Sequence, residues 1–278
     1  MAQYSTDFSE YATDSVPTDQ DWSNHWNEGG LTTNIIKDDI FGTVQYLGGK
    51  YWHLDKASSG NHILAWDDID SDANRDDVEM LLKWSMQDGD DGIYNIGLSA
   101  RASGATSGTR TQYVLWFDGQ SKYLHLRKVV NGTSTELAKS YFAAELMDGK
   151  FGWLRFRING SSLKGKWWTE QQPEPDWQLE HTDTAITAAG WVGIPIYSVD
   201  NSYIYVDYFS AGTNGDVAPW PATDSTEVRA SALYTEVAYT PVLSDVRIEA
   251  TYVEVAYIEG APGGGGGGLV QPVICINC

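Results

Sequence analysis

Apolar and polar residues alternate in short runs along most of the chain. Ten runs of five to eleven residues occur between residues 51 and 212, and each is bounded by Gly, Asp, Asn, Ser or Pro. Alternation with a period of two indicates strands with one buried face, and the turn residues indicate reversals between antiparallel strands. The runs cover residues 51–56, 62–66, 78–86, 94–102, 111–118, 123–130, 152–159, 162–170, 189–197 and 202–212. One helical turn is expected near residues 140–148, so the pattern predicts an all-β protein of two packed sheets.

The chain beyond residue 227 carries a different pattern, an internal repeat. VRASALYTEVAY (228–239) and VRIEATYVEVAY (246–257) align at an offset of 18 residues, with eight of twelve positions identical. The even offset places equivalent side chains on the same face of a strand. Both faces carry apolar side chains, and a two-stranded unit of this kind is not stable alone in water. The sequence therefore predicts a strand-rich C-terminal tail that packs on the sandwich or on another chain.

Changes in pattern divide the chain into five segments. The clearest boundary is NGDVAPWPATDSTE, which is rich in Pro, Gly and Asp. The predicted segments are an N-terminal arm (1–16), the sandwich domain (17–213), a linker (214–227), the two-copy β repeat (228–260), and a Gly-rich tether with an apolar C-terminal peptide (261–278). The six consecutive glycines of the last segment are typical of a flexible tether.

Several segments resemble one fold family. YLHLRKVVNGTSTELA, WLRFRINGSSLKGKWWTEQQPEPDWQ, AGWVGI and YVDYFSAGT follow one another as in the second half of a concanavalin A-like (laminin G-like) jelly-roll domain. The opening DFSEYATDSVPTDQDWSNHW is similar to the N-terminal strand of such domains in bacteriophage structural proteins. The resemblance covers about 200 residues and implies a two-sheet jelly-roll sandwich. It does not imply one function, because the superfamily includes hydrolases, lectins and passive structural modules.

Charge and composition exclude some classes of function. The 278 residues include 18 Lys plus Arg against 38 Asp plus Glu, which gives a formal charge of −20. Duplex binding needs clustered cations that neutralise phosphates, so no nucleic-acid partner is expected. No apolar run reaches the roughly 18 to 20 residues of a membrane span, and the N-terminus lacks the pattern of a secretory signal. The two cysteines are Cys275 and Cys278, so the main body has no internal disulfide and folding in a reducing cytoplasm is expected.

One acidic loop has the spacing of a calcium-binding loop. Oxygen-bearing residues stand at alternate positions, where a turning backbone directs hard ligands at one Ca²⁺. Ala73 replaces the glycine that normally makes the sharp turn, and the flanking segments are predicted strands, so a solvated acidic loop is the alternative. The candidate ligands are Asp68, Asp70, Asp72, Asp76 and Glu79, and calcium is the only cofactor that the sequence suggests.

One segment is the nearest match to the carboxylates of a glycoside hydrolase. The glucanases of the superfamily use Glu-x-Asp-x-Glu, which places a nucleophile and an acid/base on one strand face. Glu174, Asp176 and Glu180 have one spacer too many, and Pro173 and Pro175 disfavour a central strand. The resemblance places this PEP…W segment in a turn. A non-enzymatic protein is therefore expected.

Tryptophan provides the main indication of a binding surface. Indole rings stack on the C–H faces of sugars, although most Trp residues of a sandwich belong to its core. The candidates are Trp22, Trp26, Trp52, Trp66, Trp84, Trp116, Trp153, Trp167, Trp168, Trp177 and Trp191. The five histidines, among them His53 and His125, lack metal-ligand spacing and are interpreted as packed or surface residues. NGT (131–133) and NGS (159–161) are interpreted as hairpin turns.

These observations predict one function and two alternatives. A lectin-type sandwich without disulfides, a secretion signal or catalytic residues suits a virion protein, which is made in the host cytoplasm and displayed on the particle exterior. We expect a non-enzymatic bacteriophage structural protein, either capsid decoration or a tail or fibre module, that assembles with copies of itself and other virion proteins through its C-terminal strands. The alternatives are a carbohydrate-binding module that recognises host surface glycans and, less favoured by the residues, a glycoside hydrolase.

The expected assembly contacts are apolar and aromatic residues of the tail. They are Tyr234, Val237, Tyr239, Tyr252, Val255, Tyr257, Leu269, Val270, Val273, Ile274 and Ile276. Cys275 and Cys278 supply only two of the four ligands of a structural zinc site, so free thiols are expected, with a metal shared between chains or a disulfide as alternatives.

Overall fold

The structure is a computed structural model of the chain. It describes residues 2–19, 21–25, 31–38, 50–56, 60–70, 72–73, 75–87, 93–142, 151–199 and 203–221. These residues belong to one of two compact units, Met1–Pro221, and the second unit, Ala222–Cys278, lies outside the described residues. No described helix is long and apolar enough to cross a membrane.

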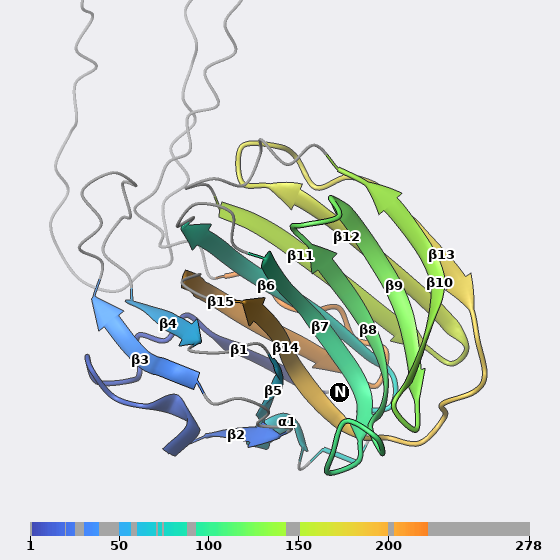
Figure 1. The fold of residues 1–278 in the computed structure, drawn as a ribbon, viewed down its shortest axis with the longest axis horizontal. Helices are drawn as coiled ribbons and strands as arrows, with labels where there is room; N and C mark the ends of the chain where they lie inside the picture. The colour runs from blue at the N-terminus through green and yellow to red at the C-terminus, as the bar shows by residue number, and fades with distance from the viewer. Residues whose placement is uncertain are drawn as a thin grey trace, which may run out of the picture. The chain divides into compact units, whose positions relative to one another are not determined.

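The described residues form two antiparallel sheets that face each other (Figure 1). Sheet A consists of β1 (Gln3–Thr6), β3 (Leu31–Asp38), β4 (Lys50–Lys56), β6 (Val78–Gln87), β11 (Phe151–Asn159), β12 (Ser162–Thr169), β13 (Leu179–Thr182) and β15 (Tyr203–Thr213). Sheet B consists of β2 (Trp22–His25), β5 (Gly60–Trp66), β7 (Ile93–Ser103), β8 (Thr111–Asp118), β9 (Tyr123–Val130), β10 (Thr133–Tyr141) and β14 (Trp191–Val199). Two short helices, η1 (Pro17–Asp19) and α1 (Asp67–Asp70), lie in connections. The predicted all-β fold is confirmed.

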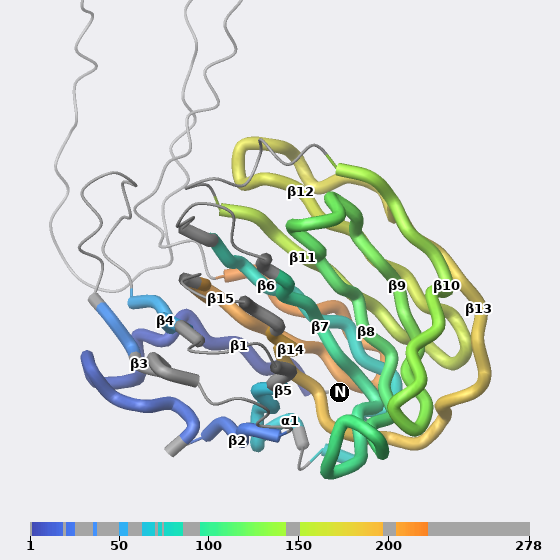
Figure 2. Tube along the Cα trace, viewed as in Figure 1, coloured from blue at the N-terminus to red at the C-terminus, as the bar shows by residue number. Residues whose placement is uncertain are grey.

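The strand order shows how the chain crosses between the sheets. Sheet A has the order β13-β12-β11-β6-β15-β4-β3, with β1 paired to β15, and sheet B has the order β10-β9-β8-β7-β14-β5-β2. The chain runs from β5 in sheet B to β6 in sheet A and back to β7 in sheet B, and it crosses in the opposite sense from β13 in sheet A through β14 in sheet B to β15 in sheet A. Between the crossings, β7 to β10 form a meander that can be followed side by side in Figure 2. This is the jelly-roll sandwich that the sequence predicts.

Five strands lie outside the ten predicted runs. β2 belongs to the opening segment that the resemblance assigned to an N-terminal strand, and β1 lies within the expected arm, where Phe8 and Tyr11 are also buried. β10 covers Ser140 and Tyr141, where a helical turn was expected to begin, and residues 143–148 lie outside the described residues. Most residues of β10 are exposed or half-buried on both faces. Because a strand without a buried face has no apolar alternation, the pattern could not reveal β10.

The two NG segments make the hairpin turns that the sequence predicts. Asn131 and Gly132 have φ values of 48° and 76° in the turn between β9 and β10. Gly160 has a φ of 56° between β11 and β12. Backbone with positive φ at these positions favours Asn and Gly and fixes the register of each hairpin.

The core lies between the sheets and consists of alternate residues of each strand. On β6, Met80, Leu82 and Trp84 are at most 1% exposed and point inward. Trp84 contacts Phe117 of β8 edge-on, with 4.8 Å between the ring centroids. Each buried ring of this size contributes on the order of 2 to 3 kcal/mol through burial of apolar area. The inward residues thus account for the stability of the sandwich and leave the outward ones for other roles.

A buried arginine joins three connections at one end of the sandwich. Arg101 of β7 is 3% exposed, and its guanidinium donates hydrogen bonds to the carbonyl oxygens of Asp76, Gly160 and Ile186 at 2.8, 2.9 and 2.5 Å. It also lies 3.3 Å from a carboxylate oxygen of Asp77. Carbonyls that would otherwise be left without donors are satisfied, so this arginine has a structural role.

Candidate functional site

The structure places the candidate calcium ligands on three different elements. Asp68 and Asp70 belong to α1, Asp72 and Asp76 follow it, and Glu79 lies on β6 with 2% exposure. Within the described part of the chain, no three His, Cys, Asp or Glu residues form a group that could hold a metal ion. Glu79 instead faces cations on the outer side of sheet A. Calcium binding by this loop stays a prediction.

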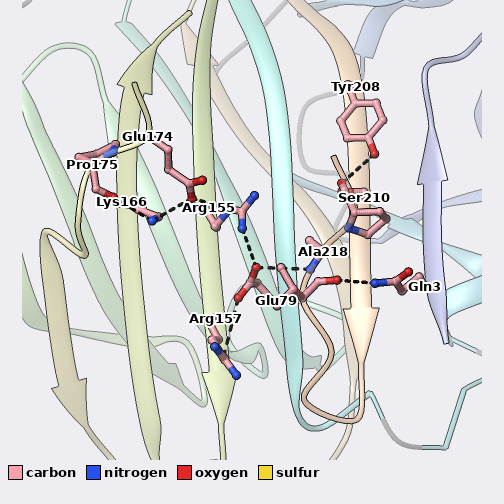
Figure 3. Close-up of polar contacts among 12 residues, drawn as sticks. Gln3, Glu79, Arg155, Arg157, Lys166, Glu174, Pro175, Tyr208, Ser210 and Ala218 are labelled. Carbon is pink, nitrogen blue, oxygen red and sulfur yellow. Dashed lines mark hydrogen bonds and ion pairs between the residues drawn. The ribbon is translucent and has the colours of Figure 1, made fainter. Parts of the chain in front are cut away.

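Two of the three carboxylates of the hydrolase pattern are engaged in separate ion pairs. Glu174 lies in the turn between β12 and β13, and its Oε1 is 3.0 Å from Arg155 Nε and 2.8 Å from Lys166 Nζ (Figure 3). Glu180 lies on β13 and pairs with a lysine of β12 at 2.7 Å, while Asp176 is exposed in the turn. The prediction that this segment forms a turn is confirmed.

Glu79 is the centre of an ion cluster on the outer face of sheet A. Its carboxylate accepts hydrogen bonds from Arg155 Nη1 at 3.0 Å and from the backbone N–H of Ala218 at 3.3 Å, and Arg157 Nε lies 3.8 Å away (Figure 3). Burial raises the pKa of the Glu79 carboxyl, and the two arginines oppose that shift. The carboxylate therefore depends on its neighbours for charge compensation, which is a structural arrangement.

The outer face of sheet A is also covered by residues 214–221, called the strap below. The carbonyl of Pro219 accepts hydrogen bonds from two hydroxyl groups of β15 at 2.6 and 2.8 Å. Trp220 packs edge-on against Trp153 and Trp168, with ring centroids 5.0 and 6.0 Å apart. Trp153 and Trp168 are 7% and 3% exposed. The rings and charges of this face are thus used by contacts within the chain.

The outer face of sheet B carries rings that are more open to solvent. Trp116 of β8, Tyr123 and His125 of β9, and Tyr141 of β10 lie on this face and are called the aromatic platform below. Tyr141 is 63% exposed, and Trp116 and Tyr123 are half-buried. Tyr123 contacts Tyr141 edge-on at 5.5 Å and His125 at 5.8 Å. The platform therefore joins three neighbouring strands.

Trp116 lies over a glycine of the next strand. Gly97 of β7 is its partner in the register, and a Cβ placed on Gly97 would lie 3.0 Å from Cε3 of Trp116. The residues beside Gly97, Ile96 and Leu98, are fully buried in the core. A Cβ on Gly97 would also clash with the backbone oxygen of Leu115, so a side chain at position 97 would disturb both the strand pairing and the indole. The glycine lets the ring lie close to the backbone while part of it stays open to solvent.

His125 is held in one orientation by two hydrogen bonds. Its Nδ1 is 2.8 Å from Glu136 Oε2, and its Nε2 is 3.2 Å from Ser121 Oγ. Burial and the charge of Arg127 lower the pKa of His125 against the opposing effect of Glu136. Since a carboxylate only accepts, the neutral ring donates from Nδ1 to Glu136 and accepts from Ser121 at Nε2.

Ser121, His125 and Glu136 are linked in the same order as the nucleophile, the base and the orienting acid of a catalytic triad. The backbone N–H groups of Gln120 and Ser121 both donate to Asp118 Oδ1 at 3.0 Å. They are therefore not available to stabilise an oxyanion, which is a major contribution in acyl transfer. The arrangement supports a fixed hydrogen-bonding side chain more than a nucleophile.

Polar side chains surround the platform. Glu136 binds Lys139 at 3.2 Å in addition to His125. Arg127 lies on β9, opposite Glu136 in the register, and is half-buried. Groups of both charges and several hydrogen-bonding types thus lie beside the rings, as in sites that bind polar ligands.

Sequence reasoning named Trp116 but could not select it among eleven candidates. Trp22, Trp52, Trp66, Trp84, Trp153, Trp167 and Trp168 are at most 7% exposed. Trp177 and Trp191 are half-buried, and Trp26 lies outside the described residues. Sequence reasoning missed Gly97, Ser121, Glu136 and Tyr141, because their relation to Trp116 and His125 depends on the strand register. The β10 sequence TSTELAKSY gave no signal of its own.

The expected assembly contacts of the tail lie outside the described residues. This applies to the internal repeat, to the apolar C-terminal peptide and to Cys275 and Cys278. Their role in assembly stays a prediction.

No protein-family model and no curated protein sequence matches the chain. Among solved structures, the chain is similar to the carbohydrate-binding module CBM66 from Bacillus subtilis, with 14% identity, a TM-score of 0.45 and coverage of 67% of this chain and 94% of the module. It is similar to the exoplasmic/lumenal domain of VIP36 in its Ca²⁺/Man3GlcNAc-bound form, with 13% identity, a TM-score of 0.48 and coverage of 75% and 90%. It is also similar to the metal-free lectin I-B4 from Griffonia simplicifolia, with 10% identity, a TM-score of 0.47 and coverage of 77% and 100%. Likenesses at this identity concern the fold and not the ligand.

Proposed function

We propose that this chain is a non-enzymatic carbohydrate-binding protein and that the aromatic platform is its binding face. The observation that carries the proposal is the position of Trp116 over Gly97, which places an indole close to the sheet with part of the ring open. Sugar rings have C–H faces that stack on such a surface. Tyr141 is 63% exposed and adds a second ring at the side of the platform.

Polar groups beside the rings support the same proposal. His125, Glu136 and Ser121 hold one another in place through hydrogen bonds of 2.8 and 3.2 Å. Side chains that are already ordered lose little conformational entropy when they bind a ligand. Carboxylate and hydroxyl oxygens of this kind recognise sugar hydroxyl groups, so the platform combines stacking with hydrogen bonding.

The test is a glycan array followed by calorimetry on the saccharides that bind. We expect Trp116→Ala to weaken binding about fivefold or more, because it removes a ring contact that contributes on the order of 1 kcal/mol. Trp177→Ala is the matched control, because Trp177 is also half-buried but packs on Lys166 beside sheet A. An array without hits, or equal losses in both variants, would contradict the proposal.

A second proposed function is structural and compatible with the first. The sequence predicts a virion protein that displays the sandwich and assembles through its tail. One observation favours it: Val217 and Trp220 of the strap are 47% and 45% exposed just before residue 222. Apolar side chains that remain exposed often belong to protein contacts. The strap is itself bound to sheet A, so it gives the following segment a firm attachment point.

The assembly role is tested by comparing the full chain with residues 1–221 in mass photometry. The shorter chain retains the complete described core and is expected to fold. We expect oligomers of the full chain and monomers of residues 1–221. Identical distributions of mass would show that the tail is not the self-assembly element, and they would leave the glycan-binding proposal unaffected.

A further inference from the structure

One cation beside the aromatic platform, Arg127, has no ion-pair partner among the residues that the structure describes. Arg127 is opposite Glu136 in the register, but Glu136 directs Oε2 to His125 at 2.8 Å and Oε1 to Lys139 at 3.2 Å. Within the part of the chain that the structure describes, Arg127 makes no ion pair, and its buried Nε makes no hydrogen bond. Buried donors without acceptors are unfavourable in a folded protein. The buried Nε is closed to a ligand, but the side chain as a whole is only half-buried, so its outer N–H groups can donate to an acceptor that comes from outside.

The position of Arg127 relative to Trp116 indicates which kind of ligand carries that acceptor. Trp116 is opposite His125, and Arg127 is two residues further along the same face of β9, so the two are diagonal neighbours on adjacent strands. Diagonal neighbours are about 7 to 8 Å apart, within reach of long side chains. A ligand stacked on the indole therefore reaches the guanidinium through one substituent. A planar carboxylate matches the fork of N–H donors of an arginine.

The overall charge of the protein acts against long-range attraction of anions. The formal charge is −20, and an acidic ligand is repelled until it is close to the surface. At physiological ionic strength the screening length is about 8 Å, so the contact with Arg127 is local and separable from the remote charges. An acidic ligand is then selected only if its carboxylate is placed beside Arg127.

We propose that the platform prefers acidic sugars, with Arg127 binding the carboxylate of a uronic or sialic acid while Trp116 stacks on the sugar ring. This rests on the proposed carbohydrate-binding function and specifies its ligand class. The carboxylate satisfies the guanidinium, and the ring covers the indole. Ser121 and Glu136 are exposed beside the rings and can bind hydroxyl groups of the same sugar, while the buried His125 keeps both in place.

The experiment uses the full chain and two matched pairs of probes in calorimetry at about 150 mM NaCl, where exposed charges are screened beyond about 8 Å. The first pair is α-1,4-linked trigalacturonic acid and its fully methyl-esterified form, and the second is 3′-sialyllactose and lactose. We expect the acid of at least one pair to bind about tenfold more tightly than its neutral partner, in keeping with a charge-assisted hydrogen bond. The pair that shows the preference tells uronic from sialic acids.

Variants test whether Arg127 causes the preference for the acidic probe over its neutral partner. Arg127→Gln should remove the difference between acid and neutral partner, while Arg127→Lys retains part of it. Lys164→Gln is the matched control, because Lys164 lies on β12 of sheet A, away from the platform, is paired with Glu180 and should leave the preference unchanged. Melting curves verify that each variant is folded.

Three outcomes would overturn the inference. They are equal binding of acid and neutral partner in both pairs, no binding of any of the four probes, and equal loss of preference in Arg127→Gln and Lys164→Gln. If neutral sugars bind and Trp116→Ala abolishes that binding, the proposed function stands although the inference fails. If the glycan array shows no binding of any saccharide, the proposed function fails as well.

Discussion

The two outer faces of the sandwich carry similar residues and use them differently. On sheet A, Trp153 and Trp168 are at most 7% exposed, and the strap and an ion cluster cover them. On sheet B, Trp116 is half-buried and Tyr141 is 63% exposed. Abundance of rings and charges therefore does not locate a binding site. The informative difference is whether the polar and aromatic groups already have partners within the chain.

Cations illustrate the same difference. On sheet A, Lys166 Nζ lies 4.4 Å from the ring centroid of Trp177, and the guanidinium of Arg155 lies 5.0 Å from that of Trp220. A ligand there would have to displace interactions that stabilise the protein. On sheet A, Arg155 is also ion-paired with Glu79 and Glu174, whereas on sheet B Arg127 makes no ion pair with any described residue. A ligand at the platform can therefore pair with Arg127 without displacing an ion pair of that arginine.

The largest expected effect concerns the ion cluster of sheet A. Arg155→Met removes the cation that binds Glu79 at 3.0 Å and leaves that 2% exposed carboxylate uncompensated, so we expect a loss of about 3 to 5 kcal/mol of unfolding free energy. Arg157→Met is the control, because Arg157 lies on the same strand, is 32% exposed and is 3.8 Å from Glu79, so its loss should stay below about 1 kcal/mol. Urea denaturation of the full chain measures both. Equal losses would mean that the cluster is not a structural unit.

The second prediction concerns Asp183, which accepts hydrogen bonds from residues of β8 and β9, the strands that also carry the platform. Burial alone would raise the pKa of the Asp183 carboxyl, but hydrogen bonds from Lys128 and Tyr113 outweigh it and lower the pKa to about 2. A carboxyl with a lowered pKa stabilises the fold above its unfolded value near 3.8 and loses that contribution as the pH falls towards 2. Asp183→Asn should therefore cost about 2 kcal/mol at pH 7.

The decisive measurement is how the difference in unfolding free energy between wild type and Asp183→Asn depends on pH. Denaturation of wild type and Asp183→Asn at pH 7, 4 and 2.5 should show the difference shrinking at the lowest pH. A difference that stays constant across this range would exclude the ionised carboxylate as its source. Lys128 and Tyr113 come from β9 and β8, the strands that also carry the platform, so the result shows how those strands are held from the side away from the ligand.

The third prediction concerns the strap. Trp220→Ala removes edge contacts with two tryptophans and a contact with Arg155, and should lower the unfolding free energy by about 1 kcal/mol. Val217→Ala, at a similarly exposed position of the strap, should change it by less than about 0.5 kcal/mol. The two melting curves distinguish a strap that stabilises sheet A from one that merely lies on it. No difference between the variants would favour the second description.

Much of the fold followed from the sequence, because ten strands carry apolar residues towards the core and are bounded by turn residues, even where, as in β11, both faces are buried. β10 did not follow, since it has no continuous buried face, and its register shifts between Glu136 and Ala138. That shift accompanies the contact between Glu136 and His125, which alternation along one strand cannot predict. Similarly, the sequence shows that Trp116 is in a strand but not that Gly97 lies under it. Such relations depend on the register between strands and become visible only in three dimensions.

The smallest expected change in stability is on the platform itself, and it provides the sharpest test of the comparison. Tyr141 is 63% exposed and contacts the chain mainly through the edge of Tyr123 at 5.5 Å, so Tyr141→Ala should change the unfolding free energy by less than about 0.5 kcal/mol. The same variant should weaken saccharide binding several-fold, because it removes an open ring at the side of the platform. Tyr208→Phe on sheet A is the converse, since it removes a hydrogen bond of 2.8 Å to the strap and should alter stability by about 1 kcal/mol without affecting binding. If Tyr141→Ala destabilised the protein and left binding intact, the two faces would not differ in the way their contacts indicate.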